Sequence, residues 1–129
     1  MRTEKSHFWI GKFNSEKSYF DFVGEDKGRY ELEDYDDVPI SKFAESQEEI
    51  WIDHDFMESG FEEPIGDLKK QFEKYSYSYH WGNELEKRCA GLSEYNALIF
   101  VNEAQIKKPN SFNTNECKLK YLGVIEYEI

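Results

Sequence analysis

The stretch YNALIFV, residues 95–101, is a continuous apolar run in an otherwise polar chain. A short apolar run of this kind predicts a buried central strand. The stretch LKYLGVIEYE, residues 119–128, predicts the last strand, and we expect the two to form an antiparallel hairpin across the polar residues 102–118. Near the N-terminus, SHFWIGKF (residues 6–13) predicts a further strand with apolar side chains on both faces.

Helices are expected between these strands. A short one should start at an N-cap, Asn14 or Ser15, and end at Gly24. Residues 40–49 follow Pro39 and predict a second short helix. Two more helices, expected to form a helical hairpin, carry apolar stripes: Ile65, Leu68, Phe72 and Tyr75 after Pro64, then Tyr77, Trp81, Leu85, Cys89 and Leu92. Residues 50–61 fit either a strand or an extended connector.

These elements predict an α+β domain that spans residues 1–129, with helices packed on one face of a small, mainly antiparallel sheet. A chain of 129 residues fits one domain, and 17% aromatic residues supply a core. Cys89 lies on an apolar stripe and is expected to be a reduced core thiol, whereas Cys117, beside a polar loop, is expected to be exposed. The polar N-terminus and the lack of a long apolar run favour a cytoplasmic protein.

The negative charge of the chain is concentrated in its middle third. Residues 25–67 hold 16 acidic residues against Lys27, Arg29 and Lys42, a net charge of −13, whereas the rest of the chain is at +2. The total of −11 argues against partners that are bare nucleic acid or an anionic membrane. Residues 25–38 predict a polar loop, and residues 43–68 contain no Lys or Arg. A basic protein partner fits this distribution.

Aromatic residues are interleaved with these acids, which is typical of a tight electrostatic interface. Charges raise the association rate, and aromatic side chains fill pockets at the centre of an interface. We therefore expect two groups of partner-binding residues: Trp51, Asp53, Asp55, Phe56 and Glu58 as central contacts, and Glu33, Asp34, Asp36 and Asp37 for steering. The alternative, that the acids only keep the protein soluble, does not require their confinement to one stretch.

Asp53, His54 and Asp55 form the one run that suggests metal chemistry. Carboxylate and imidazole groups bind divalent metals, so a metal-dependent hydrolase is an alternative function. Adjacent residues point to different sides of a strand or helix, however, and seldom converge on one ion. The sequence has no nucleophile elbow and no Gly-rich phosphate loop, so we expect a protein without catalytic residues, metal or cofactor.

Several segments, taken in order, resemble the immunity protein 22 family, whose members are small proteins encoded beside bacterial polymorphic toxins. They are HFWIGKF, the helix SEKSYFDF, the acidic loop, PISKFAESQ and WIDHDFMESGF, within residues 6–101. The resemblance implies that the protein binds a cognate toxin and blocks it by non-covalent occlusion. If that toxin is a nuclease, its substrate groove is basic, and an acidic surface would match it. An acidic adaptor protein without a toxin is a further alternative.

Overall fold

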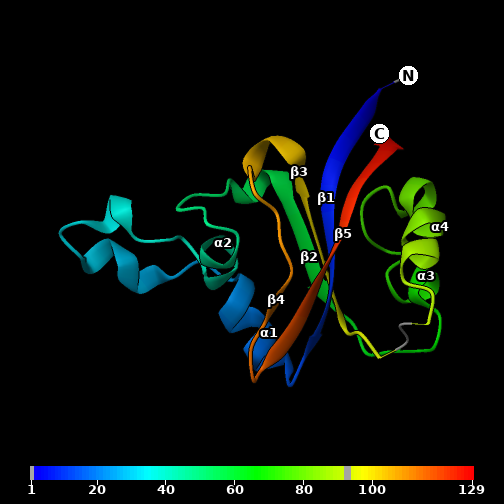
Figure 1. Cartoon of the computed structure of the whole chain (residues 1–129), viewed down its shortest axis with the longest axis horizontal. Coiled ribbons are helices and arrows are strands. Elements are labelled where there is room, and N and C mark those ends of the chain that lie inside the picture. The colour runs from blue at the N-terminus through cyan, green and yellow to red at the C-terminus, as the bar shows by residue number, and fades with distance from the viewer. Residues whose placement is uncertain (1, 92–93) are drawn as a thin grey trace.

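The computed structural model describes residues 2–91 and 94–129, and five strands within them form one antiparallel sheet in the order β2-β3-β1-β5-β4 (Figure 1). The strands are β1 (Thr3–Phe13), β2 (Met57–Phe61), β3 (Ala97–Asn102), β4 (Phe112–Asn113) and β5 (Cys117–Glu128). β1 lies at the centre and pairs with β3 on one side and with β5 on the other. The predicted α+β class and antiparallel sheet are confirmed.

The predicted hairpin between residues 95–101 and 119–128 is wrong, because β1 separates β3 from β5. The three consecutive residues Phe8, Trp9 and Ile10 of β1 are all completely buried, so both faces of this strand need cover. Helices packed on both faces of the sheet provide that cover, and burial on both faces is typical of a central strand. β5 alternates between buried and exposed positions at both of its ends, and this one-sided pattern suits a place nearer the sheet edge.

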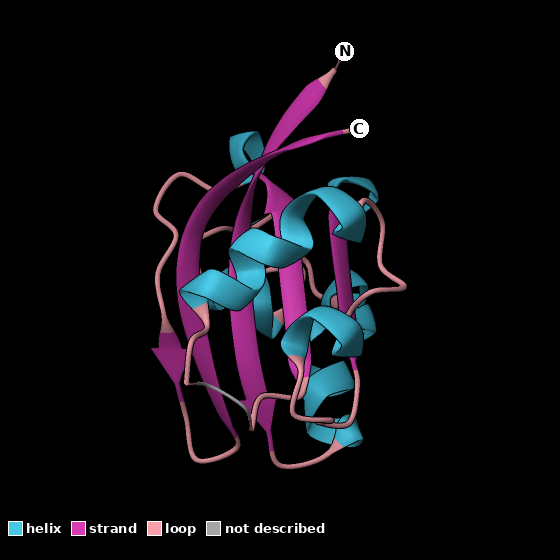
Figure 2. Ribbon diagram, turned by 90° about the vertical axis from the view of Figure 1, so that its right-hand side faces the viewer, coloured by secondary structure: helices cyan, strands magenta, loops and turns pink. Residues whose placement is uncertain are grey.

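The helices lie on both faces of the sheet rather than on the single face expected (Figure 1). They are α1 (Glu16–Val23), α2 (Lys42–Ser46), α3 (Leu68–Gln71) and α4 (Ser78–Arg88). The described residues also form four 3₁₀ helices: η1 (Lys27–Glu31), η2 (Tyr35–Asp37), η3 (His54–Phe56) and η4 (Glu103–Gln105). Trp9 and Phe13 of β1 pack with α1 and α2, whereas Phe8 and Ile10 pack with α3 and α4, which cross the sheet in Figure 2. The alternation of side chains along β1 therefore builds two cores.

The starts of α1 and α3 follow local capping groups more closely than the apolar stripes. The Ser15 side chain accepts a hydrogen bond from the Ser18 backbone and starts α1, as predicted. α3 begins only after Asp67, whose carboxylate caps it, so Ile65 lies outside the helix and is 62% exposed. α3 and α4 pack together as the predicted hairpin, and Leu92 lies outside the described residues.

The segments predicted as loops contain more order than expected. Residues 102–118 include η4 and β4, and Cys117 at their end is buried rather than exposed. Residues 50–61 divide into an extended stretch, η3 and the edge strand β2. None of the helices within residues 2–91 and 94–129 has the length and apolar character that crossing a membrane requires.

Candidate partner-binding surface

Residues 25–38 form an arm that extends away from α1, α2 and the sheet, and we call it the acidic projection (Figure 1, left). It is built from η1 and η2 rather than from irregular loop. The Asp26 carboxylate accepts a hydrogen bond from the Gly28 backbone N–H at 3.0 Å and starts η1. Glu33, Asp34, Asp36 and Asp37, the predicted steering residues, are all exposed on this projection. Their carboxylates are therefore available to a partner.

The base of the acidic projection joins it to the second acidic segment. The Asp26 N–H donates to the Ile40 carbonyl at 2.7 Å, and the Ile40 N–H donates to the Ile50 carbonyl at 2.8 Å. Three segments that are separate in the sequence thus lie side by side. The backbone hydrogen bonds of Ile40 therefore connect residues 25–38 to the segment that carries Trp51.

Arg29 connects the two acidic segments above this base. Its side chain is only 3% exposed, and its Nε and Nη2 donate to the Val38 carbonyl at 3.0 and 2.6 Å. The guanidinium carbon also lies 5.2 Å from the centre of the Tyr30 ring and 5.9 Å from that of Trp51. Planar guanidinium groups stack favourably on aromatic rings. One of the three bases in residues 25–67 is therefore used internally, which leaves the outer surface more acidic.

The joined segments expose apolar as well as acidic side chains. Trp51 is 54% exposed beside Arg29, and large apolar side chains that are also exposed on these two segments include Tyr30, Leu32 and Ile50. The Tyr30 hydroxyl donates to the Glu25 carboxylate at 2.5 Å, and this hydrogen bond raises the pKa of Tyr30 above its ordinary value. Aromatic residues in an acidic surround provide both contact area and charge for a protein partner.

The predicted central contacts do not all lie together. Asp53 uses its carboxylate to cap η3 through the Asp55 N–H at 2.9 Å, and it is held by Gln105, whose side-chain oxygen accepts from the Asp53 N–H at 3.0 Å. Asp55 and Phe56 are exposed at the end of η3. Glu58 lies on β2 and accepts a hydrogen bond from the Ser76 backbone at 2.8 Å. Glu58 therefore supports the turn before α4, away from Trp51.

The geometry around His54 does not favour a metal centre. Asp53 is engaged in the cap of η3, and no group of three or more His, Cys, Asp or Glu side chains in residues 2–91 and 94–129 is placed to hold an ion. The Nε2 atom of His54 is buried, and no hydrogen-bond partner for it is present among these residues. The run of Asp53, His54 and Asp55 is thus a turn with a structural carboxylate at its start.

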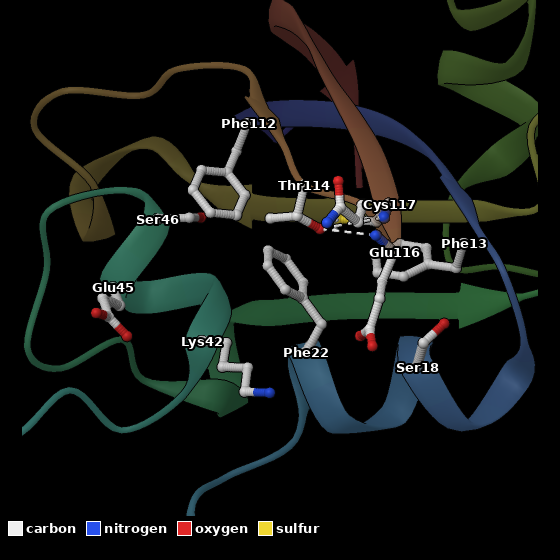
Figure 3. Close-up of a pocket in the computed structure, with 11 residues that line it drawn as sticks. Phe13, Ser18, Phe22, Lys42, Glu45, Ser46, Phe112, Thr114, Glu116 and Cys117 are labelled. Atoms are coloured by element: carbon white, nitrogen blue, oxygen red, sulfur yellow. Dashed lines mark hydrogen bonds between the residues drawn. The ribbon is translucent and has the colours of Figure 1, made fainter.

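A pocket of about 600 Å³ lies between α1, α2 and the β4–β5 corner (Figure 3). The rings of Phe22 and Phe112 line it and lie 5.9 Å apart, with Lys42 and Glu45 toward its α2 side. Cys117 also lines it, and the Thr114 hydroxyl lies 3.7 Å from its sulfur. The sequence gives no local signal for this pocket, because the α1 and α2 walls end at Ser46 and the remaining wall begins only at Phe112.

Sequence reasoning also missed Arg29 as a part of the surface. A single arginine inside a strongly acidic loop is the signal that would have pointed to it, because an internal guanidinium needs carbonyl or aromatic partners. The predicted steering residues and Trp51 lie on two segments that share one base.

Comparison with known protein families shows a match. A family model described as Immunity protein 22 matches residues 7–128, which is nearly the whole chain. No curated protein and no solved structure shows significant similarity to the chain. The match extends the resemblance seen in residues 6–101 through β5.

Proposed function

The chain belongs to the immunity protein 22 family, and we propose that it neutralises a cognate bacterial toxin by binding it and covering the surface that the toxin needs for activity. The proposed contact surface is the acidic projection together with Trp51, Asp53, Asp55 and Phe56. Neutralisation is stoichiometric and non-covalent, without catalysis or a cofactor. We place this action in the cytoplasm.

One observation supports this surface above others: Arg29, which donates to the Val38 carbonyl within the acidic projection, also lies 5.9 Å from the centre of the Trp51 ring. A loop that is ordered before binding loses less conformational entropy when the complex forms. The projection therefore presents its carboxylates in a fixed arrangement, with Trp51 at its base. Glu58, which accepts the Ser76 N–H, is better assigned to a neighbouring groove than to this face.

The charge of the surface indicates a basic partner. A toxin that cleaves nucleic acid has a basic substrate groove, because it has to bind phosphates. The carboxylates of Glu33, Asp34, Asp36 and Asp37 would then occupy phosphate positions and exclude the substrate. A toxin with another activity and a basic active-site rim would be blocked in the same way.

The alternative of a metal-dependent hydrolase has less support, because Asp53 is used to cap η3. Calorimetric titration of the purified protein with Mg²⁺, Mn²⁺ and Zn²⁺ distinguishes the two functions. Tight binding of one ion per chain that His54→Ala abolishes would favour the hydrolase and count against the present proposal.

The direct test is co-purification with the toxin encoded by the neighbouring gene. We expect a complex of fixed stoichiometry in which toxin activity is lost, and an association rate that falls as salt increases. If the two proteins do not associate, or if they associate while the toxin keeps full activity, the proposed function is wrong.

A further inference from the structure

A second recess begins where η3 ends. It is a groove of about 500 Å³ lined by Phe56, by the outer ends of β1 and β5, by β2 and by the turn before α4. We call it the Phe56 groove. Its lining includes Arg2, Glu4, Asp55, Phe56, Glu58 and Tyr77. Asp55 and Phe56 also belong to the proposed contact surface, but the other four residues lie outside it.

The charged residues that line the Phe56 groove are mainly acidic. Three carboxylates, from Glu4, Asp55 and Glu58, face one base, Arg2, among its lining residues. Glu4 accepts a hydrogen bond from the Asn102 amide at 2.8 Å, and Glu58 accepts one from the Ser76 backbone at 2.8 Å. These bonds fix two of the carboxylates and use one oxygen of each. A carboxylate has two oxygens, so each can still accept a hydrogen bond from a ligand.

Aromatic rings line the same groove. Phe56 is 53% exposed and Tyr77 is 47% exposed, and the Tyr77 ring lies 6.1 Å from that of Tyr127. Tyr77 has a φ of 60°, a left-handed conformation that is unfavourable for a residue with a large side chain. A strained residue at a recess is an observation that favours a functional role. The backbone conformation of Tyr77 places an aromatic ring beside the acids.

We propose that the Phe56 groove receives an arginine side chain from the toxin. This proposal rests on the proposed function and adds the chemical identity of one toxin contact. Fixed carboxylates match the charge of a cation, and aromatic rings match the flat face of a guanidinium. Arginine fits this pair of features better than lysine, whose compact ammonium group does not stack on rings. An anionic ligand is excluded by Glu4, Asp55 and Glu58.

The groove is placed to act together with the contact surface. Asp55 and Phe56 belong to the short segment that also carries Trp51, so one toxin surface can reach both. Trp51 contacts the toxin just before η3 in the chain, and the arginine enters the groove at the end of η3. The inserted side chain would resist lateral displacement of the complex, and it would select toxins that carry an arginine at the matching position.

The test uses acetyl-arginine methylamide as the probe and its citrulline counterpart as a neutral control of the same shape. Binding is followed through the backbone amide signals of the complete protein in a nuclear magnetic resonance titration. We expect arginine to shift the signals of Phe56, Ser76 and Tyr77 in a saturable way and citrulline to leave them unchanged. Equal shifts with the two probes, or no saturable shift with arginine, would overturn the proposal.

Two single substitutions with opposite expected effects sharpen this experiment. Asp55→Asn should weaken arginine binding about two- to fivefold, because it removes one exposed attractive charge. Arg2→Gln should strengthen it, because it removes the base that competes for the same carboxylates. Asp36→Asn, on the acidic projection, is the matched control and should have no effect on the affinity. If Asp55→Asn and Asp36→Asn weaken arginine binding equally, the probe is attracted by the general negative charge, and the proposal of a specific site in the groove is wrong.

Failure of this inference can be separated from failure of the proposed function. If the toxin binds wild type and Glu58→Gln with the same affinity while Trp51→Ala weakens binding, the toxin uses the contact surface but not the groove. If arginine binds the groove but the toxin does not bind the protein at all, the groove is real and the proposed function is wrong.

Discussion

Gln47 pairs with the backbone of Asn110 as one strand pairs with another. Its Nε2 donates to the Asn110 carbonyl at 3.0 Å, and its Oε1 accepts from the Asn110 N–H at 2.7 Å, although 63 residues separate the two in the sequence. Gln47 is completely buried at the end of α2. The side chain therefore fixes the loop between β3 and β5 to the α2 side of the sheet.

Replacing Gln47 with Leu should destabilise the protein by about 2–3 kcal/mol. The substitution keeps the approximate volume but leaves the Asn110 N–H buried without its acceptor, and an unsatisfied buried group costs about 1–3 kcal/mol. Urea unfolding followed by tryptophan fluorescence measures the change. Asn113→Ala, an exposed position on the same loop, is the control and should change the free energy of unfolding little.

Arg29→Met should release the acidic projection. The substitution removes the two hydrogen bonds to Val38 and the stacking on Trp51, so amide hydrogen exchange in residues 27–38 should become faster. Toxin affinity should fall even though the surface becomes more acidic. Lys27→Met changes the net charge equally at an exposed position and should leave exchange and affinity close to those of wild type. Equal effects of the two substitutions would contradict a positioning role for Arg29.

Gly60→Ala should destabilise the edge strand β2. A methyl group at this position would overlap the hydroxyl and ring of Tyr75, which lies across the strand. Overpacking of this kind costs about 1–3 kcal/mol. In a Tyr75→Ala background the same substitution should cost much less, and a double-mutant cycle measures the difference. Additive effects would show that Tyr75 is not the cause.

Stability should decrease in alkaline solution partly through Cys89. Burial raises the pKa of its thiol from 9.0 to about 11. Below pH 9 the thiol is protonated in the folded and in the unfolded protein. Between pH 9 and 11 it ionises in the unfolded chain while it stays protonated in the folded protein. The free energy of unfolding therefore falls as pH rises through this range. Cys89→Ala should reduce this slope between pH 9 and 10, measured by urea unfolding. If Cys89→Ala leaves the slope unchanged, other groups cause the loss of stability at alkaline pH.

The acidic projection and Trp51 should affect different rate constants of toxin binding. Neutralising Glu33, Asp34, Asp36 and Asp37 together should lower the association rate at low salt about tenfold or more. Trp51→Ala should mainly raise the dissociation rate, also by about tenfold or more. Stopped-flow mixing and surface-based dissociation measurements separate the two effects. The control neutralises four exposed acids away from this surface, Glu73, Glu86, Glu126 and Glu128, and should change the association rate less.

The sequence predicted the three long strands and the helices because their signals are local. The consecutive apolar residues around Trp9 and the Ser15 cap act within a few residues of themselves. The order of the strands was not predictable in the same way. The strand at residues 95–101 could pair with either of two apolar strands, β1 or β5. It pairs with β1 because β1 has to be covered on both faces at once.

The candidate surface was predicted in composition but not in geometry. Acidic residues and Trp51 are visible in the sequence, whereas the burial of Arg29 results from contacts with Val38 and Trp51, which lie 9 and 22 residues away. Glu58 shows that the position of an acidic residue in the sequence does not determine the surface on which it lies. It lies in the acidic stretch, yet strand alternation turns it toward Ser76 on the other face of the sheet.

The central position of β1 affects when the protein can fold during synthesis. Phe8 leaves the ribosome long before its pairing partners, because Phe100 in β3 and Gly123 in β5 lie 92 and 115 residues later in the sequence. The aromatic strand β1 therefore has to stay unpaired, and accessible to chaperones, until β3 and β5 have been synthesised. Under the proposed function, a cell would depend on a stock of finished immunity protein, because nascent chains could not yet bind the toxin.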